Sequence, residues 1–228
     1  MQTSRISYFV TGTDTGVGKT RVSCALLHAW AAEGRQVVGM KPVAAGFAEG
    51  GEHDDVRQLR AASTVRAALG QINPYGFSQA VAPHLAARHV GVRIDLARIV
   101  ESYRELAAQA DGVIVEGAGG WRVPLNDTQT LADLARELAL PVILVVGIRL
   151  GCLSHAQLTA EAIAADGLQC AGWVANQLEP DMPLAADNIE ALRQRLAAPL
   201  LGVLPYQPQG DAKMAAGYLS LAKLAAER

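Results

Sequence analysis

The feature that most constrains this chain is its glycine-rich segment 12–20, which reads Gly-Thr-Asp-Thr-Gly-Val-Gly-Lys-Thr. The apolar run 8–10 before it predicts a strand, and apolar residues at helical spacing over 19–33 predict a helix. A glycine-rich turn between a strand and a helix is typical of a phosphate-binding loop, whose backbone N–H groups face the phosphates. In such a loop Lys19 reaches the β- and γ-phosphate oxygens, and the Thr20 hydroxyl can hold Mg²⁺.

This loop is one residue longer than the general pattern. The usual spacing would put the first glycine at position 13, where the chain has Thr13, and Gly12 comes one residue earlier. A glycine-rich turn that only caps a helix would leave the Gly-Lys-Thr sequence at the helix start unexplained. The segment therefore predicts a site for a nucleoside triphosphate.

Short apolar runs alternate with helical patterns along the rest of the chain. Strands are expected at 36–43, 112–115, 141–147, 171–175 and 200–204. Helices are expected at 54–68, 94–110, 131–138, 155–165, 189–196 and 219–226, and a mobile loop at 46–53. This alternation predicts an α/β fold in which a mostly parallel sheet carries helices on both faces, in a single domain over 1–228.

Chemistry-bearing residues follow two of the predicted strands, where parallel sheets bind their ligands. Lys41 ends the second strand and would lie near the phosphates, unless it is simply exposed at a strand end. Glu116 ends an apolar strand and precedes glycines, as does the acid that serves the metal in phosphate-loop proteins. Asp54 and Asp55, at a helix start, could bind the metal or only favour the helix dipole.

Two later positions are weaker candidates for nucleotide contacts. Asn176 follows the strand 171–175 and could hydrogen-bond a base or form a turn. Pro205 and Tyr206 follow the last predicted strand and could wall a nucleotide pocket, although packing in the core accounts for Tyr206 equally well.

The composition argues against several classes of protein. The net charge is −2 and there is no long basic run, so no nucleic-acid partner is expected. The longest strongly apolar run, 141–148, is too short to span a membrane, and the first residues show no signal-peptide pattern. Three widely separated cysteines without Cys-x-x-Cys spacing predict reduced thiols rather than a zinc site. A cytoplasmic protein is therefore expected.

Together these motifs resemble the dethiobiotin synthetase family, ATP-dependent enzymes of biotin synthesis. The resemblance rests on the segments 8–15, 17–20, 41–43, 73–75, 115–121, 141–147, 150–152, 171–176 and 199–202, in the family's order. The longer phosphate loop is the family's own form. The resemblance implies a homodimer of P-loop α/β subunits that converts 7,8-diaminononanoate, CO₂ (or bicarbonate) and MgATP into dethiobiotin, ADP and phosphate.

The resemblance also implies a mechanism and roles by position. One amine and CO₂ form a carbamate, the carbamate attacks the γ-phosphate, and the second amine closes the cyclic urea and expels phosphate. Lys41 and Lys19 would be catalytic, flanking the γ-phosphate and the carbamate. Mg²⁺ ligands would be Thr20, Asp55 and Glu116, with Asp55 preferred over Asp54 for its spacing from the segment 73–75.

The remaining implied roles concern binding. The nucleotide-binding residues would be Thr15, Gly16, Val17, Gly18, Lys19, Thr20, Asp55, Glu116, Gly117, Ala118, Gly119, Asn176, Gln177, Pro205, Tyr206 and Gln207. The substrate-binding residues would be Lys41, Ala45, Pro83, Gly151, Cys152 and Leu153. The segment 150–153 would reach the diamine site of the partner subunit, so that the substrate lies at the dimer interface.

Two positions depart from the family's pattern. Ala45 stands where the family commonly has a hydroxyl residue that contacts the substrate, which leaves weaker diamine binding or a replacing water as alternatives. Ser154 stands where close relatives of the pattern often have Asn, in the region of the substrate carboxylate.

Three other functions compete with this interpretation. A switch ATPase of the partitioning or nitrogenase-reductase type carries a second lysine early in the phosphate loop, where this chain has Asp14. An enzyme like cobyrinate amidase needs a glutaminase domain, for which 228 residues leave no room. A nucleotide-binding regulator without catalysis would leave Lys41 and Glu116 unexplained.

Overall fold

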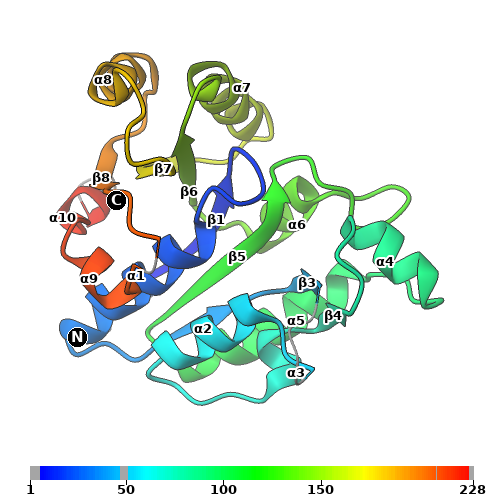
Figure 1. The fold of residues 1–228 in the computed structure, drawn as a ribbon. Coiled ribbons are helices and arrows are strands. Elements are labelled where there is room, and N and C mark those ends of the chain that lie inside the picture. Colours follow the sequence, from blue (N-terminus) through cyan, green and yellow to red (C-terminus); the bar gives the residue numbers. More distant parts are fainter. Residues whose placement is uncertain (1–5, 47–50, 209, 226–228) are drawn as a thin grey trace.

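A six-stranded sheet forms the centre of the protein, with helices on both of its faces (Figure 1). The computed structural model describes residues 6–46, 51–208 and 210–225. The strand order is β2-β5-β1-β6-β7-β8, and each neighbouring pair is parallel. The strands are β1 Ile6–Gly12, β2 Val37–Met40, β5 Gly112–Gly120, β6 Val142–Ile148, β7 Cys170–Gln177 and β8 Leu200–Leu204. The predicted α/β fold is confirmed.

Alternate side chains of the strands supply the cores on the two faces. On β1, Tyr8 and Val10 pack into one core, whereas Phe9 packs into the core on the other side. One face carries α1 (Lys19–Ala32), α2 (Asp54–Ala62), α9 (Ala212–Ala216) and α10 (Ala222–Ala225). The opposite face carries α5 (Leu96–Gln109), α6 (Leu131–Leu138), α7 (Cys152–Ala165) and α8 (Ala185–Arg195). All of β6 is buried, as a central strand covered on both faces requires.

The expectation of one strand over 36–43 is wrong. The chain leaves the main sheet at Lys41 and Pro42 and then forms β3 (Val43–Ala45), which pairs with β4 (Tyr75–Phe77) in a separate two-stranded sheet. Pro42 has no N–H group to continue a ladder of hydrogen bonds. The break places the Lys41 side chain at the carboxyl end of β2.

The expected helix 54–68 is too long, because α2 ends at Ala62. The next two residues hydrogen-bond to the edge of the sheet instead. The Ser63 hydroxyl accepts the N–H of Gly39 at 2.9 Å, and the Thr64 hydroxyl accepts the N–H of Val37 at 2.8 Å. Hydroxyl residues offer the backbone such alternatives to a helix. Four elements were not predicted from the sequence: α3 (Leu69–Ile72), β4, α4 (Pro83–His89) and α9.

The other expected elements are present with shifted ends. The largest shift is in β5, which continues through the glycines after Glu116 because it pairs with β1 as far as Gly120. Residues 47–50 of the expected loop and Ala226 of the expected last helix lie outside the described residues. Within the part of the chain that the structure describes, no helix has the length and apolar character needed to cross a membrane.

Candidate active site

The glycine-rich loop joins β1 to α1, as the sequence predicts. Gly18 begins the helix with a φ of 89°, and a Cβ atom there would lie 2.1 Å from the Asn176 amide nitrogen, so only glycine fits. The Lys19 ammonium folds back over the loop and donates to the Asp14 carbonyl at 2.8 Å. The first N–H groups of α1 have no partners within the helix and are available to an anion.

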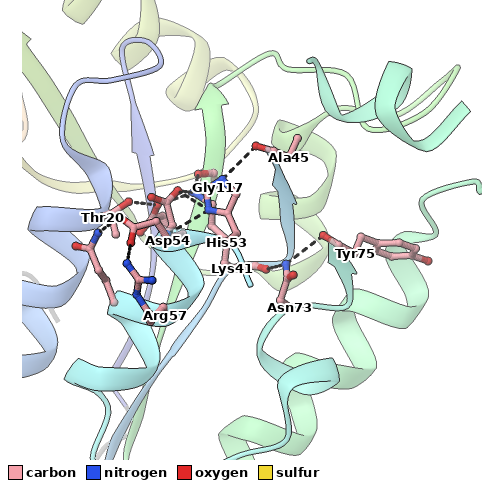
Figure 2. Close-up of polar contacts among 12 residues, drawn as sticks. Thr20, Lys41, Ala45, His53, Asp54, Arg57, Asn73, Tyr75 and Gly117 are labelled. Carbon is pink, nitrogen blue, oxygen red and sulfur yellow. Dashed lines mark hydrogen bonds and ion pairs between the residues drawn. The ribbon is translucent and has the colours of Figure 1, made fainter. Parts of the chain in front are cut away.

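Lys41 is the centre of a buried charged cluster beside this loop (Figure 2). Its Nζ lies 2.6 Å from Glu116 Oε1 and 2.8 Å from Asp55 Oδ2. It also donates to the Gly117 carbonyl at 3.3 Å. The Thr20 hydroxyl donates to the same Glu116 oxygen at 2.8 Å. The end of β2, the middle of β5 and the starts of α1 and α2 thus meet at one point.

The cluster keeps Lys41 and Asp55 charged despite burial. Burial alone would lower the pKa of Lys41, but the Glu116 and Asp55 carboxylates outweigh it and raise that pKa. Burial would likewise raise the pKa of Asp55, yet the Lys41 ammonium holds that pKa below its usual value. Lys19 behaves differently, because burial and then the Lys41 charge lower its pKa to about 8. An anion beside Lys19 would therefore stabilise its ammonium form.

The two acids at the start of α2 point in different directions. Asp55 faces Lys41, whereas Asp54 is half exposed and pairs with Arg57 (Figure 2). His53, which the sequence analysis did not assign, caps the helix. Its Nδ1 accepts the Asp55 N–H at 3.2 Å, and its Nε2 lies 3.1 Å from the Ala45 carbonyl. His53 therefore connects β3 to the helix that carries Asp55.

Asn73 holds the backbone of Lys41 in place through a hydrogen bond. Its amide group donates to the Lys41 carbonyl at 2.7 Å and to the Tyr75 carbonyl at 3.1 Å (Figure 2). These bonds connect the end of β2 to β4 where the chain leaves the main sheet. The segment 73–75, one of those on which the resemblance rests, therefore has a structural role as well.

A cavity of about 730 Å³ opens above the charged cluster. The predicted site residues that line it are Thr15, Gly16, Gly18, Lys19, Thr20, Lys41, Ala45, Asp55, Pro83, Glu116, Ala118 and Gly119. Val17 is buried beneath the loop, and Gly117 contributes its carbonyl to Lys41. The structure thus brings the phosphate loop, both lysines and three of the predicted substrate residues to one cavity.

The predicted base-binding residues form a second group outside this cavity. They are Asn176, Gln177, Pro205, Tyr206 and Gln207, at the ends of β7 and β8. Arg21 of α1 connects three of them, because its guanidinium donates to the side chains of Asn176 and Gln207 and to the Pro205 carbonyl. Arg21 was not predicted from the sequence, because its partners are far away in the chain.

The predicted contacts to a partner subunit lie elsewhere. Gly151, Cys152 and Leu153 do not line the cavity of their own chain and stand at the start of α7. The neighbouring Leu150 is 97% exposed. That this segment reaches a partner's site remains a prediction.

The oxygen atoms near the phosphate loop suit Mg²⁺. Glu116 Oε2 is buried and has no hydrogen-bond partner within the described residues. The Thr20 hydroxyl and the Asp55 carboxylate complete a set of hard oxygen donors close together. The described residues hold no cluster of three or more His, Cys, Asp or Glu side chains fit for a metal. Mg²⁺ usually takes only one or two carboxylates and completes its shell with phosphate and water, so the residues fit.

Fold and site together define a nucleotide-binding protein of the P-loop class. A family model described as "AAA domain" matches residues 7–213. Similar solved structures include the septum site-determining protein MinD complexed with Mg-ADP from Pyrococcus horikoshii, at 20% identity and a TM-score of 0.56 over 98% of this chain and 90% of that one. A ParA family ATPase from Chlorobium tepidum gives 14% identity and a TM-score of 0.56 over 98% and 94%. These likenesses show the fold alone.

Curated relatives are far more similar. The ATP-dependent dethiobiotin synthetase BioD of Aromatoleum aromaticum is 58% identical over 219 residues, covering 94% of this chain and 97% of the relative. The enzyme of the same name from Nitrosospira multiformis is 54% identical over 217 residues, covering 95% and 96%. This chain belongs to the ATP-dependent dethiobiotin synthetase family, which confirms the predicted resemblance.

Proposed function

We propose that this protein is an ATP-dependent dethiobiotin synthetase, a ligase that joins 7,8-diaminononanoate and CO₂ into the cyclic urea of dethiobiotin. ATP is the co-substrate, and ADP and phosphate are released. The observation that carries the proposal is the position of Lys41, held by two carboxylates beside the phosphate loop and facing a cavity. The family membership supports the reaction and both substrates.

The reaction has three steps. The nitrogen of one amine attacks the carbon of CO₂ and loses a proton, which gives a carbamate. A carbamate oxygen attacks the γ-phosphorus, and the bond to ADP breaks. The second amine attacks the carbamate carbon and loses a proton, the bond from that carbon to the phosphate oxygen breaks, and phosphate leaves as the ring closes. ATP thus converts a carbamate oxygen, which is a poor leaving group, into a phosphate, which is a good one.

Two lysines supply positive charge where phosphoryl transfer develops negative charge. Lys19 reaches the phosphates from the loop, and Lys41 approaches from the end of β2. Both are compact cations that suit a tight site better than a planar guanidinium would. Fixed charges of this kind need no reorganisation during the reaction, which is how they lower the barrier.

Mg²⁺ would be held by the Thr20 hydroxyl and the Asp55 and Glu116 carboxylates, whose chemistry fits it. The ion would neutralise phosphate charge in the bound nucleotide. The backbone of residues 15–20 and of the strand end 117–119 would hold the phosphates. Asn176, Gln177 and the segment 205–207 would hold the adenine.

The diamine would bind in the cavity between Lys41 and the wall formed by Ala45 and Pro83. We propose a homodimer in which Gly151, Cys152 and Leu153 of one subunit complete the diamine site of the other. The exposed Leu150 beside them supports a contact surface there. A cytoplasmic location and a single domain over 1–228 complete the proposal.

An ADP-release assay tests the function. ADP should form rapidly only when 7,8-diaminononanoate and bicarbonate are both present, because the phosphate acceptor is the carbamate. A monoamine of the same chain length is the matched control and should give no cyclic urea. Rapid ATP turnover without the diamine would contradict the synthetase and favour a switch ATPase.

A further inference from the structure

Arg21 lies in the first turn of α1, directly after Thr20, and its side chain runs away from the charged cluster toward the ends of β7 and β8. One terminal nitrogen donates to Asn176 Oδ1 at 3.3 Å and to the Pro205 carbonyl at 3.0 Å. The other donates to Gln207 Oε1 at 2.8 Å. One side chain therefore connects three segments that are distant in the sequence.

The surroundings of this guanidinium do not fully compensate its partial removal from water. All three acceptors are neutral, so none balances the charge. Burial lowers the pKa of Arg21 below its usual value, although an arginine remains charged. Its Nε is buried and without a hydrogen-bond partner in the part of the chain that the structure describes. A partly buried cation with one buried, unsatisfied donor calls for an explanation beyond stability.

Arg21 fixes the orientation of the Asn176 amide group. A guanidinium can only donate, so the oxygen of Asn176 must face it. At the other end, Asn176 Nδ2 donates to the Val17 carbonyl at 2.9 Å. Turning the amide over would place nitrogen against Arg21 and oxygen against the carbonyl, and both bonds would be lost. The amide retains one N–H and one lone pair for a ligand.

The remaining N–H and lone pair of the Asn176 amide match adenine better than guanine. Adenine presents a donor at N6 and an acceptor at N7, which one amide oxygen and one amide N–H can satisfy together. Guanine presents acceptors at both O6 and N7 and would face the Asn176 oxygen with another acceptor. An amide held in one orientation can therefore select between the two bases.

We propose that Arg21 is a positioning residue for base selection: it holds Asn176 and the segment 205–207 in the arrangement that favours adenine over guanine. The proposal rests on the proposed function only in taking ATP as the nucleotide. Arg21 is directed away from the transferring phosphate, since its side-chain hydrogen bonds among the described residues go to the ends of β7 and β8. Its removal should therefore weaken binding of the base and spare binding of the phosphates.

Calorimetric titration of Arg21→Ala with MgATP, MgGTP and magnesium tripolyphosphate separates these two effects. We expect the Kd for ATP to rise about tenfold, as loss of hydrogen bonds from a charged donor implies. The preference for ATP over GTP should fall by a similar factor, and the Kd for tripolyphosphate should change less than about twofold. Arg193→Ala, at an exposed arginine of α8, is the matched control and should change none of these values.

Two further variants guard against a folding defect. Arg21→Lys retains a charge and a donor but reaches fewer acceptors, so part of the ATP preference should return. Gln207→Ala removes one acceptor of Arg21 and should shift selectivity in the same direction by less. Thermal unfolding of each free variant shows whether it is folded.

Equal losses of ATP and tripolyphosphate affinity in Arg21→Ala would show that Arg21 supports the phosphate loop, and the proposal would be wrong. Unchanged selectivity in Arg21→Ala and Gln207→Ala would overturn it as well. These titrations use no diamine. A failure of diamine-dependent ADP release would therefore contradict the proposed function and leave the result on Arg21 intact.

Discussion

The two ends of the proposed nucleotide site are built from different interactions. At the phosphate end, two lysines and two carboxylates meet within a buried cluster centred on Lys41. At the base end, one guanidinium binds neutral amide and carbonyl oxygens around Asn176. In the proposed reaction, the first end would meet charge that changes, whereas the second would recognise a base that does not react.

This difference predicts how each end responds to substitution. Removing one member of a buried ion pair leaves the other charge uncompensated and costs about 3–5 kcal/mol. A hydrogen bond between neutral groups contributes about 0.5–1.5 kcal/mol, and one to a charged group about 1.5–3 kcal/mol. Substitutions at the phosphate end should therefore have large effects that Mg²⁺ modifies, and those at the base end should have small, graded effects.

The largest effect is expected for Lys41→Gln. Without the ammonium, Glu116 and Asp55 face one another and the transferring phosphoryl group loses a fixed cation. We expect kcat to fall about 10³-fold while the Kd for MgATP changes only a few-fold. Steady-state kinetics and nucleotide titration measure the two quantities. Lys213→Gln, at an exposed lysine of α9, is the control.

Thermal unfolding of the same variant sharpens the comparison. Lys41→Gln should have a lower Tm than the unsubstituted protein, and Mg²⁺ should restore part of the loss, because a cation can replace the missing charge. If nucleotide affinity collapsed while the residual rate stayed high, the catalytic role of Lys41 would be wrong.

Glu116→Gln should have the second largest effect. The substitution removes the negative charge that pairs with Lys41 and one proposed ligand of Mg²⁺, and it leaves the shape of the side chain at position 116 almost unchanged. We expect the Mg²⁺ concentration for half-maximal activity to rise about tenfold or more, and kcat to fall about 10²-fold. A magnesium titration of ADP release measures both. Glu137→Gln, on the exposed side of α6, should alter neither, and an unchanged magnesium requirement in Glu116→Gln would remove Glu116 from the metal site.

The two ends also differ in how much of them could be predicted from the sequence. Lys19 and Lys41 come after β1 and β2, Glu116 lies within β5 just before its glycines, and the parallel sheet brings these positions together. A local motif therefore predicts a shared site. The partners of Arg21 lie 155 to 186 residues further along the chain, and no local pattern connects them. The proposed adenine contacts were predicted in part from their positions after strands and in part from the family resemblance, whereas Arg21, which hydrogen-bonds to three of these residues, was not predicted.

The fold shows the same contrast between local and distant causes. The apolar pattern predicts the six main strands and most helices, since burial on both faces leaves a local signature. The apolar pattern continues through Pro42, because hydropathy does not depend on whether a residue has an N–H group. It therefore predicts one strand over 36–43 where the structure has two. It also extends α2 beyond Ala62, because the hydrogen bonds of Ser63 and Thr64 to the edge of β2 depend on tertiary structure.

Ala45→Ser should have the smallest effect. It tests whether the size of a substitution's effect depends on closeness to the phosphate end or on whether the interaction involves charge. Ala45 lines the cavity at the phosphate end, and its contact with His53 uses the backbone carbonyl, which the substitution retains. The new hydroxyl offers the diamine one neutral hydrogen bond, so we expect the KM for the diamine to fall about threefold and the KM for ATP to stay unchanged. Ala80→Ser, elsewhere on the cavity wall, is the control for added polarity.

An unchanged KM for the diamine in Ala45→Ser would show that this side chain does not face the substrate. A decrease well beyond tenfold would mean that the hydroxyl meets a charged group, since a neutral hydrogen bond cannot account for it. A change of about threefold would show that a neutral hydrogen bond contributes only a small amount even beside the charged cluster. The large effects expected for Lys41 and Glu116 would then arise from uncompensated charge rather than from closeness to the reacting atoms.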